Sequence, residues 1–393
     1  MRFNLWEDCN RVPLTELLSF IVDNRGKTVP TAPSGHKLIA TNCVTNNTLF
    51  PVYEKIRYLS EETYQTWFRA HPIPGDILFV NKGTPGRVCL VPDPVDFCIA
   101  QDMIALRADE SKIYPKYLFA VLRSREIQQQ IYNTNVGDVI PHFKKQFLNQ
   151  LLIPIPERSI QESIGDLYYV LSLKAERNKM INDNLQQQAA ALFSSLYDRS
   201  NTEVRFTDLI QILGGGTPKT GENTYWNGNI AFFTPKDVGT PYTLITEKTI
   251  SKEGLSHCNS RLYPVNTVFV TARGTVGKVG MSGVPMAMNQ SCYALVGKET
   301  HQLLVYFYTL KAVDRLKHKA SGAVFDAITT RDFESEQIMK LSHDDATAFL
   351  RVAEPMFQEV LNNNIENLRL STLRDSLLPK LMSGEIDVSA VQL

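Results

Sequence analysis

The chain carries the same short motif twice, 191 residues apart. Lys-Gly-Thr-Pro-Gly-Arg-Val at residues 82–88 returns as Arg-Gly-Thr-Val-Gly-Lys-Val at residues 273–279, and each copy follows an extended apolar run. Further matches at nearly the same offset are residues 12–17 with 204–209, 60–62 with 251–253, Gln101 with Gln290, and the segments around Gly137 and Gly322. Solenoid repeats run about 20 to 50 residues, so this longer period indicates a duplicated domain.

Length and composition set the frame for this duplication. The 393 residues, 43% of them hydrophobic, suffice for two cores joined by connecting segments. We expect a soluble, cytoplasmic protein, because no apolar signal-peptide stretch and no run of about 18 apolar residues is present. The six cysteines form no CxxC pair and have no histidine at metal-binding spacing, which favours reduced thiols over disulfides or a metal site.

Two segments show the periodicity of long helices. Residues 159–197 contain no proline and a single glycine, Gly165, and apolar residues recur at steps of three and four. The pattern returns over residues 343–382, where Pro355 predicts a kink and Pro379 a terminal position. Such a seam is typical of a helix that packs against another helix.

The two predicted helices have similar lengths and most simply bury their seams on each other. A helix of about 38 residues spans about 57 Å, longer than a domain of about 150 residues is wide. The alternative is that each helix packs on its own globular domain. Lys174, Asn178 and Asn364 fall on the seams, which indicates either a chosen register or a locally solvated seam. In either case we expect a spacer between two similar domains.

The sequence therefore predicts an α+β protein with a pseudo-two-fold internal duplication. Segments rich in Pro, Gly, Thr, Val and Phe, with short apolar runs and turn residues, predict two similar mixed α/β domains. Two long helices forming an antiparallel coiled coil would separate them. The expected boundaries are 1–155 for the first domain, 156–200 for the central helix, 201–342 for the second domain, and 343–393 for the C-terminal helix and tail.

Several ordered motifs resemble the specificity subunit of type I restriction-modification systems. They are Gly-Gly-Gly-Thr-Pro-Lys at 214–219, Tyr-Trp at 225–226, Asn-Ile-Ala-Phe-Phe-Thr-Pro-Lys-Asp at 229–237, Thr-Ala-Arg-Gly-Thr-Val-Gly-Lys at 271–278, Asn-Gln-Ser-Cys-Tyr-Ala at 289–294, and Leu-Arg-Asp-Ser-Leu-Leu-Pro-Lys-Leu-Met-Ser-Gly-Glu-Ile at 373–386. The resemblance covers the whole chain, with two target-recognition domains alternating with two conserved helical regions. The first domain departs from the pattern, with Asp-Asn-Arg-Gly-Lys-Thr at 23–28 in place of the glycine run and Pro85 in place of Val276. These departures fit a family whose two recognition domains read different half-sites.

The resemblance implies a non-catalytic DNA-binding subunit. Each recognition domain would read one half of a split double-stranded DNA site, while the helices set the unread spacer and dock two methyltransferase subunits. Restriction and translocase subunits would complete the complex. S-adenosylmethionine, ATP and magnesium would bind the partner subunits, with no cofactor in this chain. If the helices act as a ruler, inserting about four residues after Gln188 would lengthen the gap by one or two base pairs.

The charge distribution bears on this role. The chain is neutral overall, with 41 basic and 41 acidic residues. Residues 157–200 and 343–393, which contain the two predicted helices, carry 9 basic and 14 acidic residues, which leaves 32 basic against 27 acidic residues on the rest of the chain. Because phosphate contacts supply much of DNA affinity, we expect weak binding by the isolated chain and tight binding with methyltransferase subunits.

The motifs of several enzyme classes are missing from the sequence. There is no GxxxxGK[ST] phosphate loop, no GxGxxG fingerprint and no Asn-Pro-Pro-Tyr methylation motif. The glycine-rich stretches are therefore predicted to be turns, either beside a groove or in plain hairpins. Pro92 and Asp93 with Glu110 and Lys112 match a PD...ExK nuclease pattern, which the second repeat lacks. The alternatives are thus a stand-alone endonuclease, or an interaction scaffold that binds no nucleic acid.

Candidate DNA contacts follow from the chemistry of base and phosphate recognition. Arg and Lys suit guanine and phosphate, and threonine methyl groups suit thymine. The candidates in the first domain are Lys82, Thr84, Arg87, His142, Lys144 and Lys145, and those in the second are Lys219, Thr220, Tyr225, Lys236, Arg273, Thr275, Lys278 and Arg331. The alternative for each is a solvated surface residue.

Overall fold

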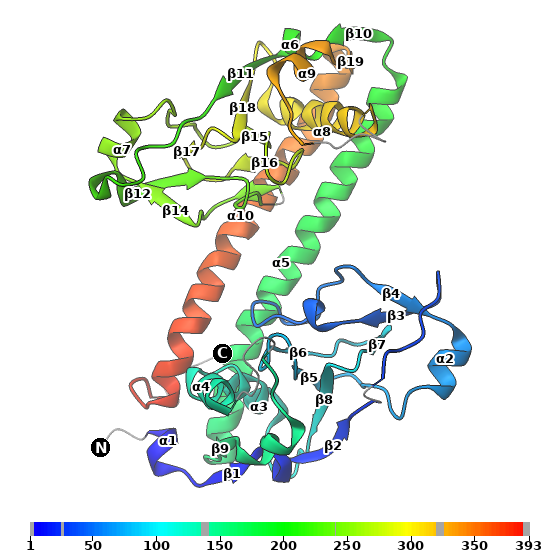
Figure 1. The fold of residues 1–393 in the computed structure, drawn as a ribbon, viewed down its shortest axis with the longest axis vertical. Helices are drawn as coiled ribbons and strands as arrows, with labels where there is room; N and C mark the ends of the chain where they lie inside the picture. Colours follow the sequence, from blue (N-terminus) through cyan, green and yellow to red (C-terminus); the bar gives the residue numbers. More distant parts are fainter. Residues whose placement is uncertain (1–3, 25–26, 135–140, 240, 320–325, 388–393) are drawn as a thin grey trace. The chain divides into compact units, whose positions relative to one another are not determined.

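The computed structural model describes residues 4–24, 27–134, 141–239, 241–319 and 326–387, and it divides into two compact units (Figure 1). Unit 1 comprises residues 1–178 and 366–393, and unit 2 comprises residues 179–365. Each unit contains about half of each long helix, α5 (Arg158–Arg199) and α10 (His343–Met382). These helices agree closely with the predicted spans. The helix α10 continues through Pro355, and Pro379 lies in its last turn.

Unit 1 contains a four-stranded sheet of order β2-β8-β5-β6, a three-stranded sheet of order β4-β3-β7 and the pair β1-β9. Neighbours in the larger sheet are antiparallel, whereas β3 is antiparallel to β4 and parallel to β7. The elements are α1 (Leu5–Asp8), β1 (Arg11–Pro13), η1 (Leu14–Leu17), β2 (Leu18–Val22), β3 (His36–Ile39), η2 (Thr41–Cys43), β4 (Arg57–Leu59), α2 (Glu61–Thr66), β5 (Ile77–Val80), β6 (Val88–Leu90), β7 (Phe97–Ile99), β8 (Met103–Ala108), α3 (Pro115–Leu122), α4 (Arg125–Thr134), η3 (Lys145–Gln150) and β9 (Leu152–Pro154).

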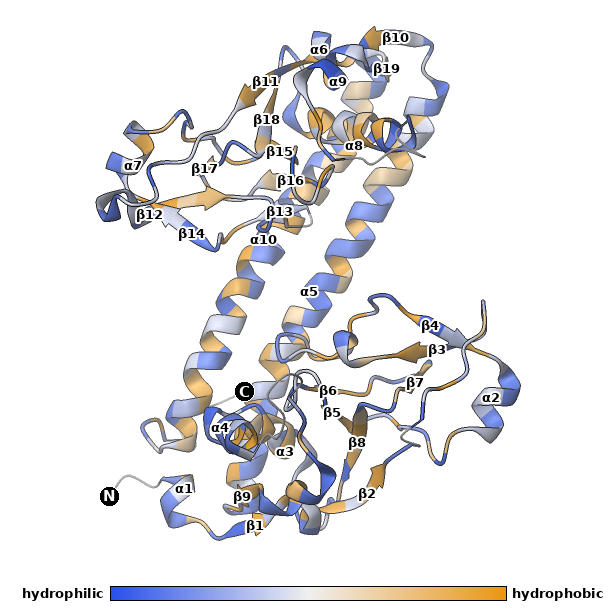
Figure 2. Cartoon of the chain, in the orientation of Figure 1, coloured by the Kyte–Doolittle hydropathy of each residue, from blue (hydrophilic) through white to orange (hydrophobic). Residues whose placement is uncertain are grey.

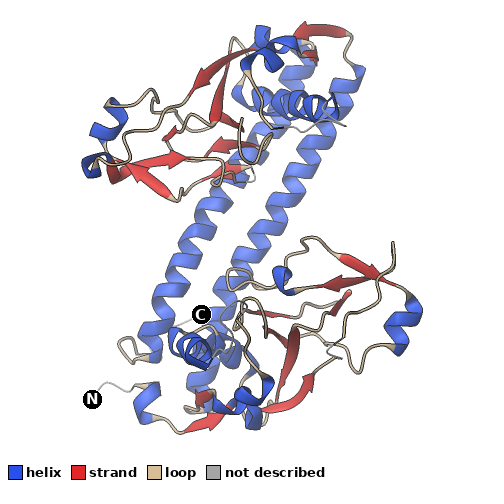
Figure 3. Cartoon of the chain, viewed as in Figure 1, coloured by secondary structure: helices blue, strands red, loops and turns tan. Residues whose placement is uncertain are grey.

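Unit 2 repeats this topology and adds a fifth strand, β13, which pairs in parallel with β16 at the edge of the larger sheet (Figure 3). Its sheets have the orders β11-β18-β15-β16-β13, β14-β12-β17 and β10-β19, and β12 is again antiparallel to one neighbour and parallel to the other. The elements are β10 (Thr202–Arg205), α6 (Phe206–Leu209), β11 (Ile210–Gly214), η4 (Asn223–Tyr225), β12 (Trp226–Phe233), β13 (Tyr242–Thr243), β14 (Lys248–Ile250), α7 (Lys252–Ser256), β15 (Val268–Thr271), β16 (Val279–Ser282), β17 (Met286–Met288), β18 (Cys292–Gly297), α8 (Gln302–Lys319), α9 (Thr330–Ser335) and β19 (Gln337–Lys340).

The repeated sequence segments occupy equivalent places in the two units, which confirms the α+β fold with an internal duplication. Ser60 and Ser251 both act as helix N-caps, accepting hydrogen bonds from the backbone N–H of Thr63 (3.2 Å) and Gly254 (3.0 Å). Both strands that precede the repeated motif, β5 and β15, are buried along their whole length, as their apolar sequences require. The segments around Gly137 and Gly322 lie outside the described residues.

Within each unit, the α5 and α10 segments run antiparallel and share a core with the globular part. In unit 2, Phe193 of α5 packs on Phe307 of α8 and on Phe349 of α10, with ring centroids 4.9 and 5.5 Å apart. In unit 1, Tyr168 of α5 lies in one core cluster with Leu378 of α10. Figure 2 shows hydrophobic and hydrophilic residues alternating along both helices. The helix halves therefore pack on each other and also on their own globular part, so the two predicted alternatives coexist.

The polar seam residues form hydrogen bonds across the helix pair. In unit 1, the amide nitrogen of Asn178 donates to Glu366 (2.6 Å) and Asn367 (2.9 Å). In unit 2, Asn182 donates to Asn364 (2.9 Å) and accepts from Asn363 (2.9 Å). Asn178 and Asn182 are buried, and their hydrogen bonds to α10 support a chosen register. Lys174 and Glu366 beside Asn178 reach solvent, so the seam is also locally solvated.

Two findings on the described residues concern membrane-spanning helices and metal-binding groups. No helix among the described residues combines the length and the apolar character needed to cross a membrane. Within the same residues, no three His, Cys, Asp or Glu side chains are grouped so that they could hold a metal ion.

Candidate nucleic-acid interface

Each copy of the repeated motif forms a tight hairpin loop with the same backbone. In unit 1, the loop between β5 and β6 is closed by hydrogen bonds from Val80 N to Arg87 O (2.9 Å) and from Gly86 N to Val80 O (3.0 Å). In unit 2, Thr271 N donates to Lys278 O (3.0 Å) and Gly277 N to Thr271 O (2.9 Å).

The glycines of the motif are explained by backbone conformation. Gly83 and Gly86 have φ of +85° and +87°, and Gly274 and Gly277 have φ of +82° and +74°. This left-handed region is accessible to glycine without steric cost. The spacing of the two glycines is therefore fixed by the loop, and the turn predicted at residues 273–278 is confirmed. Gly214, for which a turn was also predicted, is instead the last residue of β11.

Four candidate cations project from the two hairpin loops. Lys82 and Arg87 in unit 1 and Arg273 and Lys278 in unit 2 have exposed side chains. None of the four forms an ion pair with another residue in the described part of the chain. Such charges remain available to a phosphate or to the edge of a base.

A second segment lies beside each hairpin and brings further candidates close to it. His142 forms a bridge with Lys82 in unit 1, where Gly83 N donates to Pro141 O (3.0 Å). The equivalent bridge in unit 2 joins Arg273 to Ala327. His142 and Lys82 are thus placed together.

The candidates that follow these bridges differ in their availability. Lys144 is exposed, whereas Lys145 forms an ion pair with Asp23. In unit 2, Arg331 is exposed in the first turn of α9, whose N-cap Thr329 forms a capping box with Asp332. A free charge contributes more to a phosphate contact than one already neutralised.

The threonine and lysine candidates around the unit 2 hairpin are partly engaged within the protein. The hydroxyl of Thr275 donates to Pro235 O (3.1 Å), and its carbonyl accepts a hydrogen bond from the hydroxyl of Thr271. Lys236 lies next to Pro235 and faces Glu247 at 3.6 Å, with both side chains exposed. Thr84 of the first hairpin is half-buried and accepts from Arg87 N through its carbonyl (3.4 Å).

Three candidates lie elsewhere in unit 2, in and beside the short helix η4 at the edge of the smaller sheet. Lys219 and Thr220 are exposed, and the carbonyl of Lys219 accepts from the indole nitrogen of Trp226 at 3.1 Å. Tyr225 stacks on His257 with ring centroids 4.9 Å apart. The predicted contacts of unit 2 thus divide into two groups, one at the hairpin and one at the smaller sheet.

The glycine run that precedes Lys219 has a packing role. A β-carbon on Gly215 would lie 2.2 Å from the carbonyl oxygen of Asn289, and one on Gly216 would lie 2.6 Å from the backbone nitrogen of Asn259. Neither glycine has room for a side chain.

Side chains at the end of α3 and in α4, which are not among the predicted candidates, support the unit 1 hairpin. Arg123 donates through one nitrogen to the carbonyls of Val88 (2.7 Å) and Thr48 (2.5 Å), and burial lowers the pKa of its guanidinium. Gln128 donates to the carbonyl of Gly86 (2.9 Å). Helical periodicity marks these positions as inward-facing but does not identify their partners.

Two residues of the nuclease-like pattern, Asp93 and Lys112, differ in their surroundings in unit 1. Asp93 is exposed after β6, and Lys112 faces Asp109 (3.2 Å) and donates to Glu16 O (3.0 Å).

Burial raises the pKa of Cys98 and of Cys292 to about 12. These thiols are therefore protonated near neutral pH and do not suit nucleophilic catalysis.

Comparison with known proteins gives a consistent result. Residues 23–187 and 199–340 match the sequence family described as type I restriction modification DNA specificity domain. The specificity subunit of type I restriction enzyme HindI from Haemophilus influenzae is 23% identical, with 79% of this chain and 86% of that protein covered. The EcoR124I/EcoR124II specificity subunit from Escherichia coli is 29% identical over 42% of this chain and 45% of its own length.

A solved structure is similar in fold. The crystal structure of the type I restriction-modification S subunit from M. genitalium aligns with a TM-score of 0.61 and 15% identity. The alignment covers 97% of this chain and 98% of that one. At this identity the likeness concerns the fold.

Proposed function

Because the chain belongs to the family of type I restriction-modification DNA specificity domains, we propose that it recognises a bipartite double-stranded DNA site. Unit 1 would bind one half-site and unit 2 the other. The observation that carries this proposal is the pair of hairpins with the same backbone and different exposed cations. One fold can recognise two different sequences if the hairpin backbone stays the same and the side chains that it carries differ.

The chemistry of the hairpins suits duplex DNA. Arginine and lysine bind guanine edges in the major groove, which admits a two-stranded β-ribbon. Lys82 with Arg87, and Arg273 with Lys278, would each supply two cations from one narrow loop. Lys144 and Arg331 would add phosphate contacts that position each unit.

We further propose that catalysis belongs to partner subunits. Two methyltransferase subunits would bind the long helices, and restriction and translocase subunits would join that assembly in the cytoplasm. Exposed apolar residues on the helices are suitable docking positions: Val170 and Leu373 in unit 1, and Met180, Ile181 and Val352 in unit 2.

The hairpin assignment can be tested by matched substitutions. In one variant Lys82 and Arg87 are changed to alanine, and in the other Arg273 and Lys278. With the methyltransferase subunit and S-adenosylmethionine present, we expect relaxed specificity in one half-site only, because each side chain that reads a base supplies about 1 to 3 kcal/mol of discrimination. Mapping of methylated adenines measures the result. A change in both half-sites from either variant would contradict the modular proposal, and methylation by the purified chain alone would contradict its non-catalytic role.

The role of the helices as a ruler requires a revised insertion. Gln188 lies within unit 2, next to the fully buried Ala189, so lengthening α5 there would shift packed residues against α10. Seven residues inserted after Asn178 and seven after Ile365 fall at the unit boundaries and nearly preserve the seam. This adds about 10 Å of helix, or about three base pairs. An unchanged gap with full methylation would assign the spacing to the partner subunits.

A further inference from the structure

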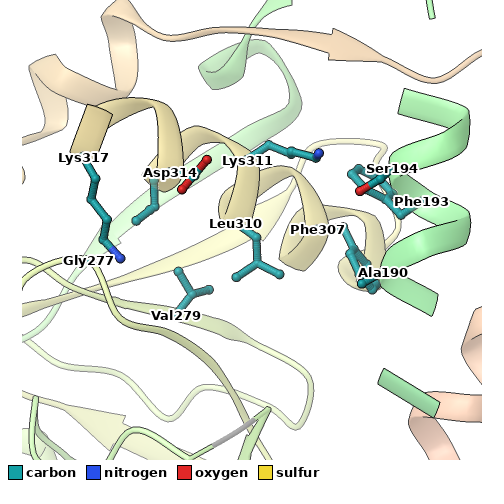
Figure 4. Close-up of a pocket in the computed structure, with 11 residues that line it drawn as sticks. Ala190, Phe193, Ser194, Gly277, Val279, Phe307, Leu310, Lys311, Asp314 and Lys317 are labelled. Carbon is teal, nitrogen blue, oxygen red and sulfur yellow. The ribbon is translucent and has the colours of Figure 1, made fainter. Parts of the chain in front are cut away.

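Unit 2 contains a cleft beside its hairpin that the DNA-binding proposal does not use. The cleft has a volume of about 370 Å³ and lies between α5, α8 and the start of β16 (Figure 4). Its floor is apolar and includes Phe193 of α5, Phe307 and Leu310 of α8, and Val279 of β16.

Two of the four apolar residues of the floor, Leu310 and Val279, present hydrophobic surface to solvent. Phe193 and Phe307 stack with ring centroids 4.9 Å apart and are themselves buried. Leu310 is 36% exposed and points into the cleft opposite Val279 (Figure 4). An apolar side chain inserted here would remove Leu310 and Val279 from water, which is the usual source of binding energy at a docking pocket.

The rim of the cleft carries two cations that are not neutralised. Lys317 points toward Gly277 of the hairpin, and Lys311 points toward Ser194 of α5 (Figure 4). Neither lysine forms an ion pair within the described residues, although Lys311 also lies 5.1 Å from the ring centre of Tyr197. The one carboxylate of the lining, Asp314, lies 3.6 Å from the imidazole of His318. With two lysines and one carboxylate, the lining has a formal charge of +1, which complements an acidic group.

The corresponding flank of the unit 1 hairpin is filled. Gln128 of α4 donates to the carbonyl of Gly86 at 2.9 Å, and a β-carbon on Gly86 would lie 3.1 Å from both Gln128 and Ile131. The same hairpin backbone is thus closed against its helix in unit 1 and open in unit 2.

We propose that the unit 2 cleft seats an aliphatic or aromatic side chain flanked by carboxylates, contributed by a protein that docks on α5 and α8. The inference rests on the proposed function, which supplies a methyltransferase subunit as that protein. A phosphodiester backbone would satisfy the lysines but would place charged phosphates over the apolar floor, so a protein segment is favoured. Since unit 1 is closed at this place, the two docking faces bind their subunits with unequal strength.

The test uses the full chain and the methyltransferase subunit encoded with it. One variant, Leu310→Glu, places a carboxylate on the partly exposed floor, and a second combines Lys311→Glu with Lys317→Glu. Arg125→Glu on α4 is the matched control, because it reverses an exposed charge on a unit 1 helix. We expect both cleft variants to weaken one of two binding steps by about 30-fold, as for a central interface anchor, while the control leaves both steps unchanged. Isothermal titration calorimetry separates the steps, and hydrogen-exchange mass spectrometry of peptides from residues 179–365 reports the folding of unit 2.

A photo-crosslinking residue at position 310 identifies the occupant in the complex with DNA. Crosslinking to the methyltransferase subunit, with unchanged DNA affinity of the variants, supports the proposal. Crosslinking to DNA, or a loss confined to DNA affinity, would overturn it and assign the lysines to phosphate. The proposal would also be overturned if the Leu310→Glu variant bound two methyltransferase subunits with the same affinities as the wild-type chain. If the wild-type chain bound no methyltransferase at all, the proposed function itself would fail.

Discussion

The two hairpins share one backbone but are held in place by different means. In unit 1 the supports come from outside the loop, since Arg123 and Gln128 bind the carbonyls of Val88 and Gly86. In unit 2 the supports lie in the hairpin and its neighbouring loop, where Thr271 binds Thr275 and Thr275 binds Pro235. After duplication, the glycine conformations were kept while the surrounding contacts diverged. The backbone of the loop is therefore the shared feature, and its supports are specific to each unit.

A deeper difference lies at one matched position in the core. Leu151 precedes β9 and accepts from Leu14 N (2.9 Å), and Glu336 precedes β19 and accepts from Phe206 N (2.9 Å), each through its carbonyl. Both side chains are fully buried. Leu151 packs in an apolar cluster, whereas Glu336 forms ion pairs with Arg315 (3.6 Å) and Lys319 of α8. The same backbone position thus holds a buried leucine in unit 1 and a buried glutamate in unit 2, where the adjacent helix supplies cations.

Exchanging these two residues should produce the largest effect. Leu151→Glu buries a carboxylate in an apolar cluster, and we expect a loss of about 3 to 5 kcal/mol in the stability of unit 1. Glu336→Leu should change the stability of unit 2 little, because Arg315 and Lys319 are about half exposed and regain water. Urea unfolding followed by hydrogen-exchange mass spectrometry measures each unit separately. Equal losses from both substitutions would show that the two positions are not alternatives.

The helix seam offers the next comparison. Asn182→Ala leaves two asparagines of α10, Asn363 and Asn364, without their buried partner, and we expect a loss of about 1 to 3 kcal/mol in unit 2. Asn178→Ala should cost less in unit 1, because its partner Glu366 lies 3.4 Å from Lys174, and both of those side chains reach solvent. The same unfolding experiment compares them. If Asn178→Ala lowered the free energy of unfolding more than Asn182→Ala, the main contact that fixes the helix register would lie in unit 1.

The sequence predicted the fold far better than the site. The long helices and the duplication were predictable because a periodic seam and a repeated glycine spacing each follow from one geometric requirement, as Gly83 and Gly274 show. The contacts of Arg123 and Glu336 were not predictable, because each partner is distant in sequence or on another element. Lys82 and Arg273 are exposed, as either a DNA contact or a solvated surface residue would be. Their contacts with DNA stay a prediction until they are measured.

Substitutions of the side chains that support each hairpin should have a smaller effect on stability. Thr271→Val removes the acceptor of Lys278 N (2.9 Å) and the donor to Thr275, and we expect a loss of about 1 kcal/mol, mostly local to the unit 2 loop. Gln128→Ala should act in the same way on the unit 1 loop. With methyltransferase present, each variant should lower discrimination at its own half-site. The comparison fails if either variant alters the half-site of the other unit.

The smallest expected effect concerns pH and the rings packed on the smaller sheets. In unit 1, Tyr64 stacks between His36 (4.1 Å) and His71 (4.3 Å), whereas in unit 2 Tyr225 stacks on His257 (4.9 Å). Burial holds the pKa of His71 below its usual range. The neutral ring is therefore favoured in the folded state. The stability that neutral His71 contributes is fully present above about pH 6.5, which is the pKa of histidine in the unfolded chain. This stability is lost as the pH falls through the lower pKa of His71 in the folded protein.

Unit 1 should accordingly lose stability between about pH 7 and pH 5, and His71→Phe, which keeps a ring beside Tyr64, should reduce that loss. Unit 2 of the same molecule is the internal control, because the His71→Phe substitution in unit 1 does not change the surroundings of the histidines in unit 2. Urea unfolding at pH 7, 6 and 5, resolved by hydrogen exchange corrected for intrinsic rates, measures both units. An unaltered pH dependence of unit 1 in His71→Phe would assign the acid sensitivity to other groups, of which the pair of His36 and Glu61 (2.6 Å) is the nearest.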